Sequence, residues 1–202
     1  GFSIVTWTGN NSNATIGHGL GAVPSLILVK SYTNASKSMV GGSFLGSNKY
    51  MSMNYTVYSN PGGTLTTDSS TFQAFSDSTF SVGTNSDMNV SGQNYMAYCF
   101  TIGSNFDMKT YTGTGASGKT ISFDFEPKFV MVKNMYYLSS ESHWMGFVKG
   151  GLTSRGLTMS SYYDTVLAGY ISNTLIGNTL TINSSETAAN RNGDTYLAIA
   201  WG

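Results

Sequence analysis

The sequence predicts an all-β protein made of two tandem antiparallel β-sandwich domains related by internal duplication. Three observations lead to this prediction. A nine-residue pattern from the middle of the chain returns at its end. Apolar segments are short and separated by turn residues about every 8–12 positions, and no stretch keeps an apolar period of 3.6 residues. Only 10% of the 202 residues are charged, and Gly, Ser, Thr and Asn fill most polar positions, a composition typical of strands joined by turns.

The repeated pattern is Gly-x-x-Tyr-apolar-Ala-x-x-aromatic, at Gly92–Phe100 and again at Gly193–Trp201. A repeat of roughly 100 residues is far longer than a solenoid repeat, so it indicates a duplicated domain. We therefore predict one β-sandwich repeat over residues 1–102 and a second over residues 103–202.

Strands in the first half are predicted where apolar residues alternate or run together between turn signals. These segments are 2–8, 15–16, 25–32, 39–45, 49–55, 70–75, 79–82 and the closing segment 92–100. The run Leu26–Val29 is continuously apolar but short, which predicts a central strand buried on both faces.

The second half repeats the order of the first. Its matching segments are 108–113 with 4–9, 127–133 with 24–30, 156–160 with 50–54, and 178–182 with 78–82. Residues 121–125 alternate with period two and predict one more strand.

The composition also bears on the classes of partner. Nucleic-acid binding depends on clustered Lys and Arg, and none cluster here, so we expect no nucleic-acid partner. No apolar run approaches the length of a membrane span, so no membrane insertion is expected. Cys99 is the single cysteine and lies in the predicted closing strand, where it is expected to be a small buried hydrophobic residue.

The segment Gly113–Thr120 satisfies the P-loop pattern G-x-x-x-x-G-K-T letter for letter. A P-loop requires a helix after the lysine, because the helix N-terminus helps to hold the phosphates. The alternating residues that follow Lys119 predict a strand instead. We therefore expect this segment to be a hairpin loop and not a nucleotide site.

Other catalytic or metal-binding patterns are weak. Asp124 and Glu126 are expected on one face of a strand, at a spacing that could suit paired carboxylates in glycoside hydrolysis, although a solvated strand face is favoured. The only histidines, His18 and His143, lie in unrelated contexts. No metal-ligand spacing occurs, and no serine lies in a Gly-x-Ser-x-Gly elbow. We expect no catalytic residues, no metal and no cofactor.

Aromatic residues remain as candidates for a binding surface. They form 13% of the chain, and several lie beside predicted loops rich in Ser, Gly and Asn, a composition typical of adaptable binding surfaces. The candidate surface-binding aromatics are Tyr32, Tyr136, Tyr137, Trp144, Tyr162 and Tyr163. The alternative is that these rings cap the ends of the sandwiches or pack between domains.

One segment resembles a known family. Thr15–Lys30 is similar to the Gly-His-Gly-Leu-Gly-x-x-Pro, apolar strand, Lys segment of bacteriophage tail-fibre and related appendage proteins. The aromatic-Thr-Gly turns at Trp7–Gly9 and Tyr111–Gly113 resemble the same family, as do the two closing segments. The second copy has Ser122–Pro127 in place of Gly-His-Gly-Leu, which favours a structural role for the bend that contains His18.

The resemblance implies a non-enzymatic structural protein of the virion, located on the particle surface in a tail fibre or appendage. Its expected partners are other virion proteins, copies of itself in a homo-oligomer, and a host-surface glycan during host attachment. Two alternatives stay open: a capsid-decorating or spacer protein whose surfaces serve assembly, and a glycan-active enzyme that uses Asp124 and Glu126.

Overall fold

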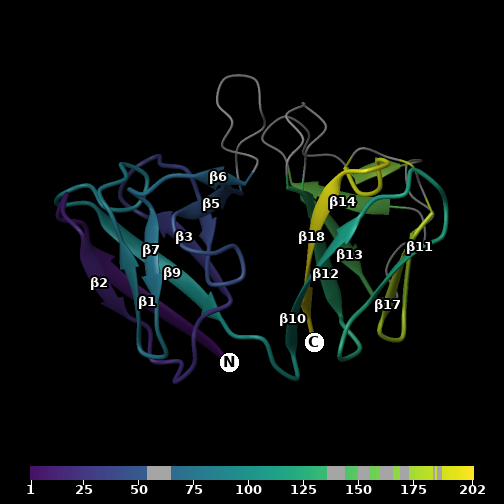
Figure 1. The fold of residues 1–202 in the computed structure, drawn as a ribbon, viewed down its shortest axis with the longest axis horizontal. Coiled ribbons are helices and arrows are strands. Elements are labelled where there is room, and N and C mark those ends of the chain that lie inside the picture. The colour runs from purple at the N-terminus through teal and green to yellow at the C-terminus, as the bar shows by residue number, and fades with distance from the viewer. Residues whose placement is uncertain are drawn as a thin grey trace. The chain divides into compact units, whose positions relative to one another are not determined.

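The computed structural model describes most of the chain, and every strand in it pairs antiparallel with its neighbours (Figure 1). The described residues are 1–53, 65–135, 144–149, 155–159, 166–168, 173–183, 185 and 188–202. No helix occurs among them. The prediction of an all-β protein is therefore confirmed.

The described residues form two compact units. Unit 1 contains those up to Ile102, and unit 2 contains those from Gly103 onward. Within unit 1, the amino group of Gly1 donates to Oγ1 of Thr101 at 2.8 Å. Within unit 2, the N–H of Gly202 donates to the carbonyl of Asn105 at 3.0 Å. The first and last residues of each unit are thus neighbours.

Unit 1 contains a six-stranded sheet and a three-stranded sheet. The six-stranded sheet has, in spatial order, β1 (Phe2–Thr8), β9 (Asn94–Phe100), β3 (Leu26–Ser31), β4 (Met39–Gly41), β5 (Lys49–Ser52) and β6 (Thr66–Thr67). The three-stranded sheet has β2 (Ala14–Gly17), β8 (Thr79–Val82) and β7 (Phe72–Phe75).

The core of unit 1 lies between these two sheets. The larger sheet contributes Tyr95, Ala97 and Cys99 from its second strand, and the smaller sheet contributes Phe72 and Phe80, all with no exposed surface. Each large side chain buried in this way stabilises the fold by about 1.5–3 kcal/mol. Alternate residues of β9 enter this core, which is the period-two pattern of a strand with one face on the core.

Unit 2 repeats the topology of unit 1. Its six-stranded sheet has β10 (Phe106–Thr112), β18 (Thr195–Trp201), β12 (Phe129–Asn134), β13 (Trp144–Val148), β14 (Arg155–Met159) and β15 (Val166–Ala168). Its three-stranded sheet has β11 (Lys119–Ser122), β17 (Thr179–Ile182) and β16 (Thr174–Ile176). The order of strands along each sheet is the order found in unit 1, and the core again lies between the sheets.

Most predicted strands match observed ones to within a few residues, and three details differ. β11 ends at Ser122, so the predicted strand over residues 121–125 stops early and Asp124 lies in the bend that follows. Four observed strands were not predicted: β6, β13, β15 and β16. Trp144, which begins β13, was expected beside a loop. The predicted strand 49–55 ends at Ser52 as β5, and its last two residues lie outside the described residues.

Candidate functional site

A buried asparagine fastens the loop between β1 and β2 to the end of unit 1. Asn89 is fully buried, and its side-chain nitrogen donates to the carbonyls of Ser12 at 2.6 Å and Gly83 at 2.7 Å. Its side-chain oxygen accepts from the N–H of Asn10 at 3.1 Å. One amide therefore holds three backbone groups from two separate segments, and a buried polar group with such partners specifies that geometry closely.

Two glycines and a tyrosine complete this arrangement. A Cβ on Gly9 would lie 2.2 Å from the carbonyl oxygen of Val90, so only glycine fits at that position. Gly92 has φ 75°, which favours glycine, and the hydroxyl of Tyr95 accepts from the N–H of Val90 at 3.0 Å. We call this set of contacts the Asn–Gly–Tyr corner, and it accounts for the repeated Gly-x-x-Tyr pattern.

The same corner recurs in unit 2. The side-chain nitrogen of Asn190 donates to the carbonyl of Ala116 at 2.7 Å, and its oxygen accepts from the N–H of Thr114 at 2.8 Å. The hydroxyl of Tyr196 accepts from the N–H of Arg191 at 2.8 Å. The two copies therefore share the contacts that hold the loop after their first strand against the turn before their last strand.

The P-loop-like segment of unit 2 lies in this corner. Four of its N–H groups already donate hydrogen bonds within unit 2. Those of Gly113, Gly115 and Gly118 donate to backbone carbonyls, and that of Thr114 donates to the side-chain oxygen of Asn190. Lys119 begins β11, and its Nζ lies 5.7 Å from the centre of the Tyr111 ring. A strand follows the lysine, as predicted, and these N–H groups are not free to surround a phosphate. The expected hairpin is corrected, because β10 and β11 belong to different sheets and the loop crosses from one sheet to the other.

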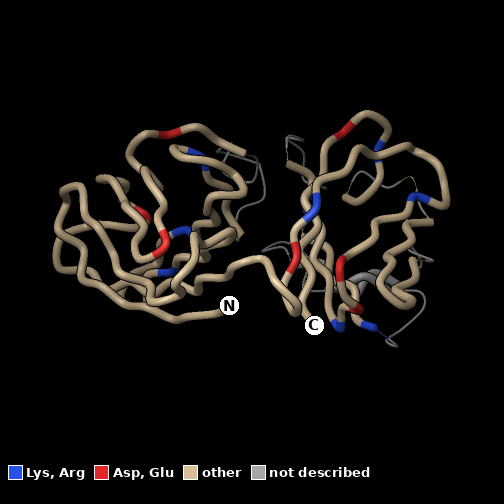
Figure 2. The backbone as a smooth tube through the Cα atoms, turned by 60° about the horizontal axis from the view of Figure 1, so that its bottom comes forward, with Lys and Arg blue, Asp and Glu red and all other residues tan. Residues whose placement is uncertain are grey.

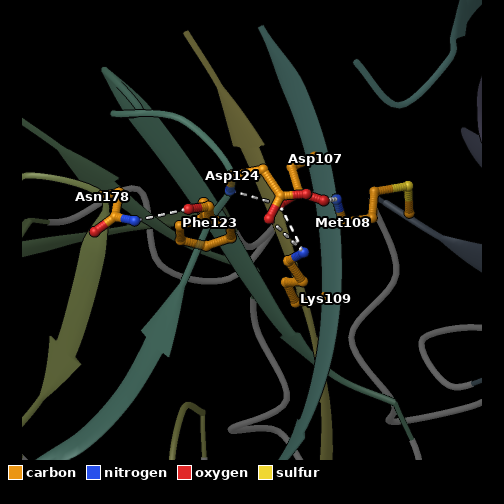
Figure 3. A network of polar contacts seen from close by, with 6 residues as sticks. All are labelled: Asp107, Met108, Lys109, Phe123, Asp124 and Asn178. Carbon is orange, nitrogen blue, oxygen red and sulfur yellow. Dashed lines mark hydrogen bonds and ion pairs between the residues drawn. The ribbon is translucent and has the colours of Figure 1, made fainter. Parts of the chain in front are cut away.

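A polar network in unit 2 uses a buried carboxylate (Figure 3). Asp107 is 2% exposed, and its two oxygens accept from the N–H of Met108 at 2.7 Å and of Asp124 at 3.2 Å. Its Oδ2 also lies 3.1 Å from Nζ of Lys109, which raises the pKa of that lysine through the hydrogen bond to Asp107. Every contact of this carboxylate fixes backbone or a neighbouring charge, which is a structural role.

Asp124 and Glu126 do not form a carboxylate pair on a strand, so that expectation is corrected. They lie in the connection between β11 and β12, and each pairs with a lysine. Asp124 lies 3.3 Å from Nζ of Lys109, and Glu126 lies 2.6 Å from Nζ of Lys149. Both side chains are more than half exposed, so neither carboxylate lies in the buried, water-excluded setting typical of a catalytic acid.

The histidine that the structure describes is also structural. His18 is 2% exposed; its Nδ1 accepts from the N–H of Leu20 at 3.2 Å, so its Nε2 donates to the carbonyl of Ser76, also at 3.2 Å. These contacts hold the glycine-rich bend after β2. His143 lies outside the described residues. No cluster of His, Cys, Asp or Glu suited to a metal occurs within the described ranges.

Two further titratable groups are buried, a thiol in unit 1 and an amine in unit 2. Burial raises the pKa of the Cys99 thiol to about 12, so the thiol is protonated at neutral pH and behaves as the small hydrophobic residue expected. Burial lowers the pKa of Lys133, which is 1% exposed in β12, to about 8. The described part of the chain contains no helix of the length and apolarity needed to cross a membrane.

The two predicted surface aromatics that the structure describes differ in their exposure to solvent. Tyr32 is 56% exposed, as a binding residue should be. Trp144 is only 1% exposed, because it begins a strand in the middle of the unit 2 sheet, so its assignment to an exposed surface is corrected. The other four candidates lie outside the described residues: Tyr136, Tyr137, Tyr162 and Tyr163.

Tyr32 lies on a backbone that is tied to the start of β9. Its N–H donates to the carbonyl of Asn94 at 3.1 Å, and the adjacent Thr33 hydroxyl donates to Oε1 of Gln93 at 2.8 Å. The hydroxyl of Thr8 donates to Oδ1 of Asn94 at 2.9 Å. Tyr32, Thr33, Gln93, Asn94 and Thr8 thus form an uncharged group, which we call the Tyr32 patch.

The Tyr32 patch offers an exposed ring beside hydrogen-bonding groups. Across the part of the chain that the structure describes, the hydroxyl of Tyr32 and the side-chain nitrogens of Gln93 and Asn94 have no protein partner, so they can bind a ligand. A rigid ring next to amide donors suits an uncharged polar ligand. Sequence reasoning missed Thr33, Gln93 and Asn94, because common polar residues in a chain rich in them carry no signal by themselves.

Charged residues are few on both units. Figure 2 shows Lys, Arg, Asp and Glu as isolated positions along a backbone that is otherwise uncharged.

No curated protein and no solved structure matches the chain. One family model matches residues 1–202, so it includes both copies. The chain therefore belongs to the family described as a domain of unknown function, DUF7483.

Proposed function

We propose that this protein is a non-enzymatic structural component of a virion, part of a tail fibre or surface appendage, and that it helps the particle to attach to a host-surface glycan. One observation carries the proposal: the two copies share the residues that close the fold, whereas Asp107, Asp124, Glu126, His18 and Cys99 each occur in one copy only. Asn89 and Asn190 hold equivalent loops in the two units. Asp107, by contrast, has a serine, Ser3, in its place in unit 1.

The described charged and nucleophilic groups support the same conclusion. Lysines form ion pairs with Asp107, Asp124 and Glu126. His18 and Cys99 are buried in structural positions. Catalysis generally needs a perturbed group held in a cleft. The exposed, uncharged Tyr32 patch is better suited to binding than to reaction.

Immunogold electron microscopy of purified particles tests the location. An antibody against this chain should label the tail or another appendage. Label along the capsid would favour the decorating role, and particles without label would reject a virion protein.

Binding of the full chain to host cells and to a glycan array tests attachment. Tyr32→Ala should weaken binding about tenfold or more, because an exposed anchor ring is lost, whereas Tyr32→Phe keeps the ring and should retain most of the binding. Absence of binding by the unmodified protein would reject attachment while leaving the location intact. If Tyr32→Ala bound as tightly as the unmodified protein, the Tyr32 patch would not be the surface that binds the glycan.

A further inference from the structure

Strand β1 forms an edge of the six-stranded sheet of unit 1, and β9 is the one described strand that it pairs with. The N–H of Thr101 donates to the carbonyl of Gly1 at 3.0 Å, and the N–H of Gly9 donates to the carbonyl of Gln93 at 2.8 Å. The backbone N–H and C=O groups of the odd-numbered residues of β1 therefore point toward β9. The backbone groups of the even-numbered residues face outward: Phe2, Ile4, Thr6 and Thr8. No described residue forms a hydrogen bond to any of these outward backbone groups.

The same residues also expose apolar side chains on the outer face of the sheet. Phe2 and Ile4 are each 55% exposed, and Tyr98, which is paired with Ile4, is 36% exposed. The Phe2 ring lies 4.9 Å from that of Phe100 and is stacked on Tyr98 at 6.3 Å. Open backbone groups and exposed rings therefore meet along one strand.

The equivalent edge in unit 2 is protected in a way that β1 is not. β10 points Asp107 and Lys109 toward the inside of the sandwich, and inward-facing charges are a known means of preventing an edge strand from pairing with another chain. β1 has Ser3 and Val5 at these positions and no charged residue along its length. The outer-face residues Phe106 and Met108 of β10 are buried, at 4% and 3% exposure.

An uncharged edge accepts a strand of the same kind, because no like charges oppose each other when the strand meets itself. We infer that β1 pairs antiparallel with β1 of a second copy of this chain, so that two six-stranded sheets join across a two-fold axis. With the axis at Val5, Phe2 lies opposite Thr8 of the second copy and Ile4 lies opposite Thr6, so every outward backbone group of the strand gains a partner.

Two-fold pairing of this kind is closed. Each β1 edge is used once, so the assembly stops at two copies instead of growing into a fibre. The inference rests on the β1 edge alone and does not depend on the proposed role in a virion.

The first test measures the mass of the full chain in solution by analytical ultracentrifugation. The unmodified protein should be a dimer, and Ile4→Lys should raise the dissociation constant of the dimer by about 100-fold or more, because it places two lysines at the centre of the interface. The matched control is Ile176→Lys, at a 74% exposed isoleucine on β16, an edge strand of unit 2. That control should leave the dimer unchanged.

A second pair of variants probes the backbone. Proline at Thr6 removes an outward N–H without touching the ladder to β9, a position where an edge strand tolerates proline. Thr6→Pro should abolish the dimer, and Thr110→Pro, at the equivalent position of β10, should not. A monomer at the highest soluble concentration, or a dimer that survives both Ile4→Lys and Thr6→Pro with unchanged affinity, would overturn the inference.

Discussion

Removal of the Asn89 side chain should destabilise unit 1 and leave unit 2 unaffected. In Asn89→Ala the carbonyl of Gly83 loses its partner in a buried setting, at a cost of about 1–3 kcal/mol. The carbonyl of Ser12 and the N–H of Asn10 are partly accessible to water, so each loss costs about 0.5–1 kcal/mol. The free energy of unfolding of unit 1 should fall by about 2–5 kcal/mol in total, which lowers the thermal midpoint of a domain of this size by about 8–40 °C.

Hydrogen exchange measured by mass spectrometry is the appropriate assay, because it reports on peptides from each unit separately. The matched control is Asn13→Ala, whose oxygen accepts one exposed bond from Gln73 at 3.3 Å, and which should change stability by less than about 0.5 kcal/mol. If Asn89→Ala changed unit 1 no more than this control, the Asn–Gly–Tyr corner would not be what closes the fold. Equal destabilisation of both units would contradict the prediction that Asn89 stabilises unit 1 alone.

Three further predictions concern single residues. Gly113→Ala should unfold unit 2, because its Cβ would lie 2.2 Å from the carbonyl oxygen of Arg191, whereas Gly103→Ala, with nothing within 4 Å, should be neutral in thermal melts. The Cys99 thiol, whose pKa burial raises to about 12, should resist a maleimide reagent at pH 8 in the folded protein and react once urea unfolds it; rapid labelling of the folded chain would contradict its burial. Burial lowers the pKa of Lys133 to about 8 from 10.5, so the unfolded chain binds more protons between these values and the stability of unit 2 should rise with pH across that window. Urea titrations of the protein and of Lys133→Met should show this rise only with the lysine present.

The strand pattern could be predicted from the sequence because it depends on local periodicity. The segments at Phe2–Thr8, Leu26–Ser31 and Thr79–Val82 have turn residues around them and apolar residues at the strand period, and each became a strand. The prediction that Trp144 is exposed was wrong because its neighbours in the sequence resemble a loop. Its burial results from its place inside a sheet, which a local pattern does not reveal.

The candidate site was less predictable than the fold. Tyr32 was found because an exposed tyrosine beside a loop is conspicuous, but its neighbours Gln93 and Asn94 lie about 60 residues further along the chain and meet it only through the pairing of the loop with β9. The buried Asn89 and Asn190 were missed for a similar reason. Both lie just before the repeated glycine, where asparagine is an ordinary turn residue. Several of the backbone groups that they hold come from the loop after the first strand of the unit, far earlier in the chain.

The neighbouring ends of each unit bear on how such a chain can change over evolutionary time. Gly1 lies beside Thr101, and Asn105 lies beside Gly202, so the chain enters and leaves each sandwich at one place. A module with this property can be copied, deleted or inserted into a loop of another protein without cutting any sheet, because the host needs to supply only two adjacent attachment points. Recombination at the Ile102–Gly103 junction should therefore yield foldable products with one, two or more sandwiches in series.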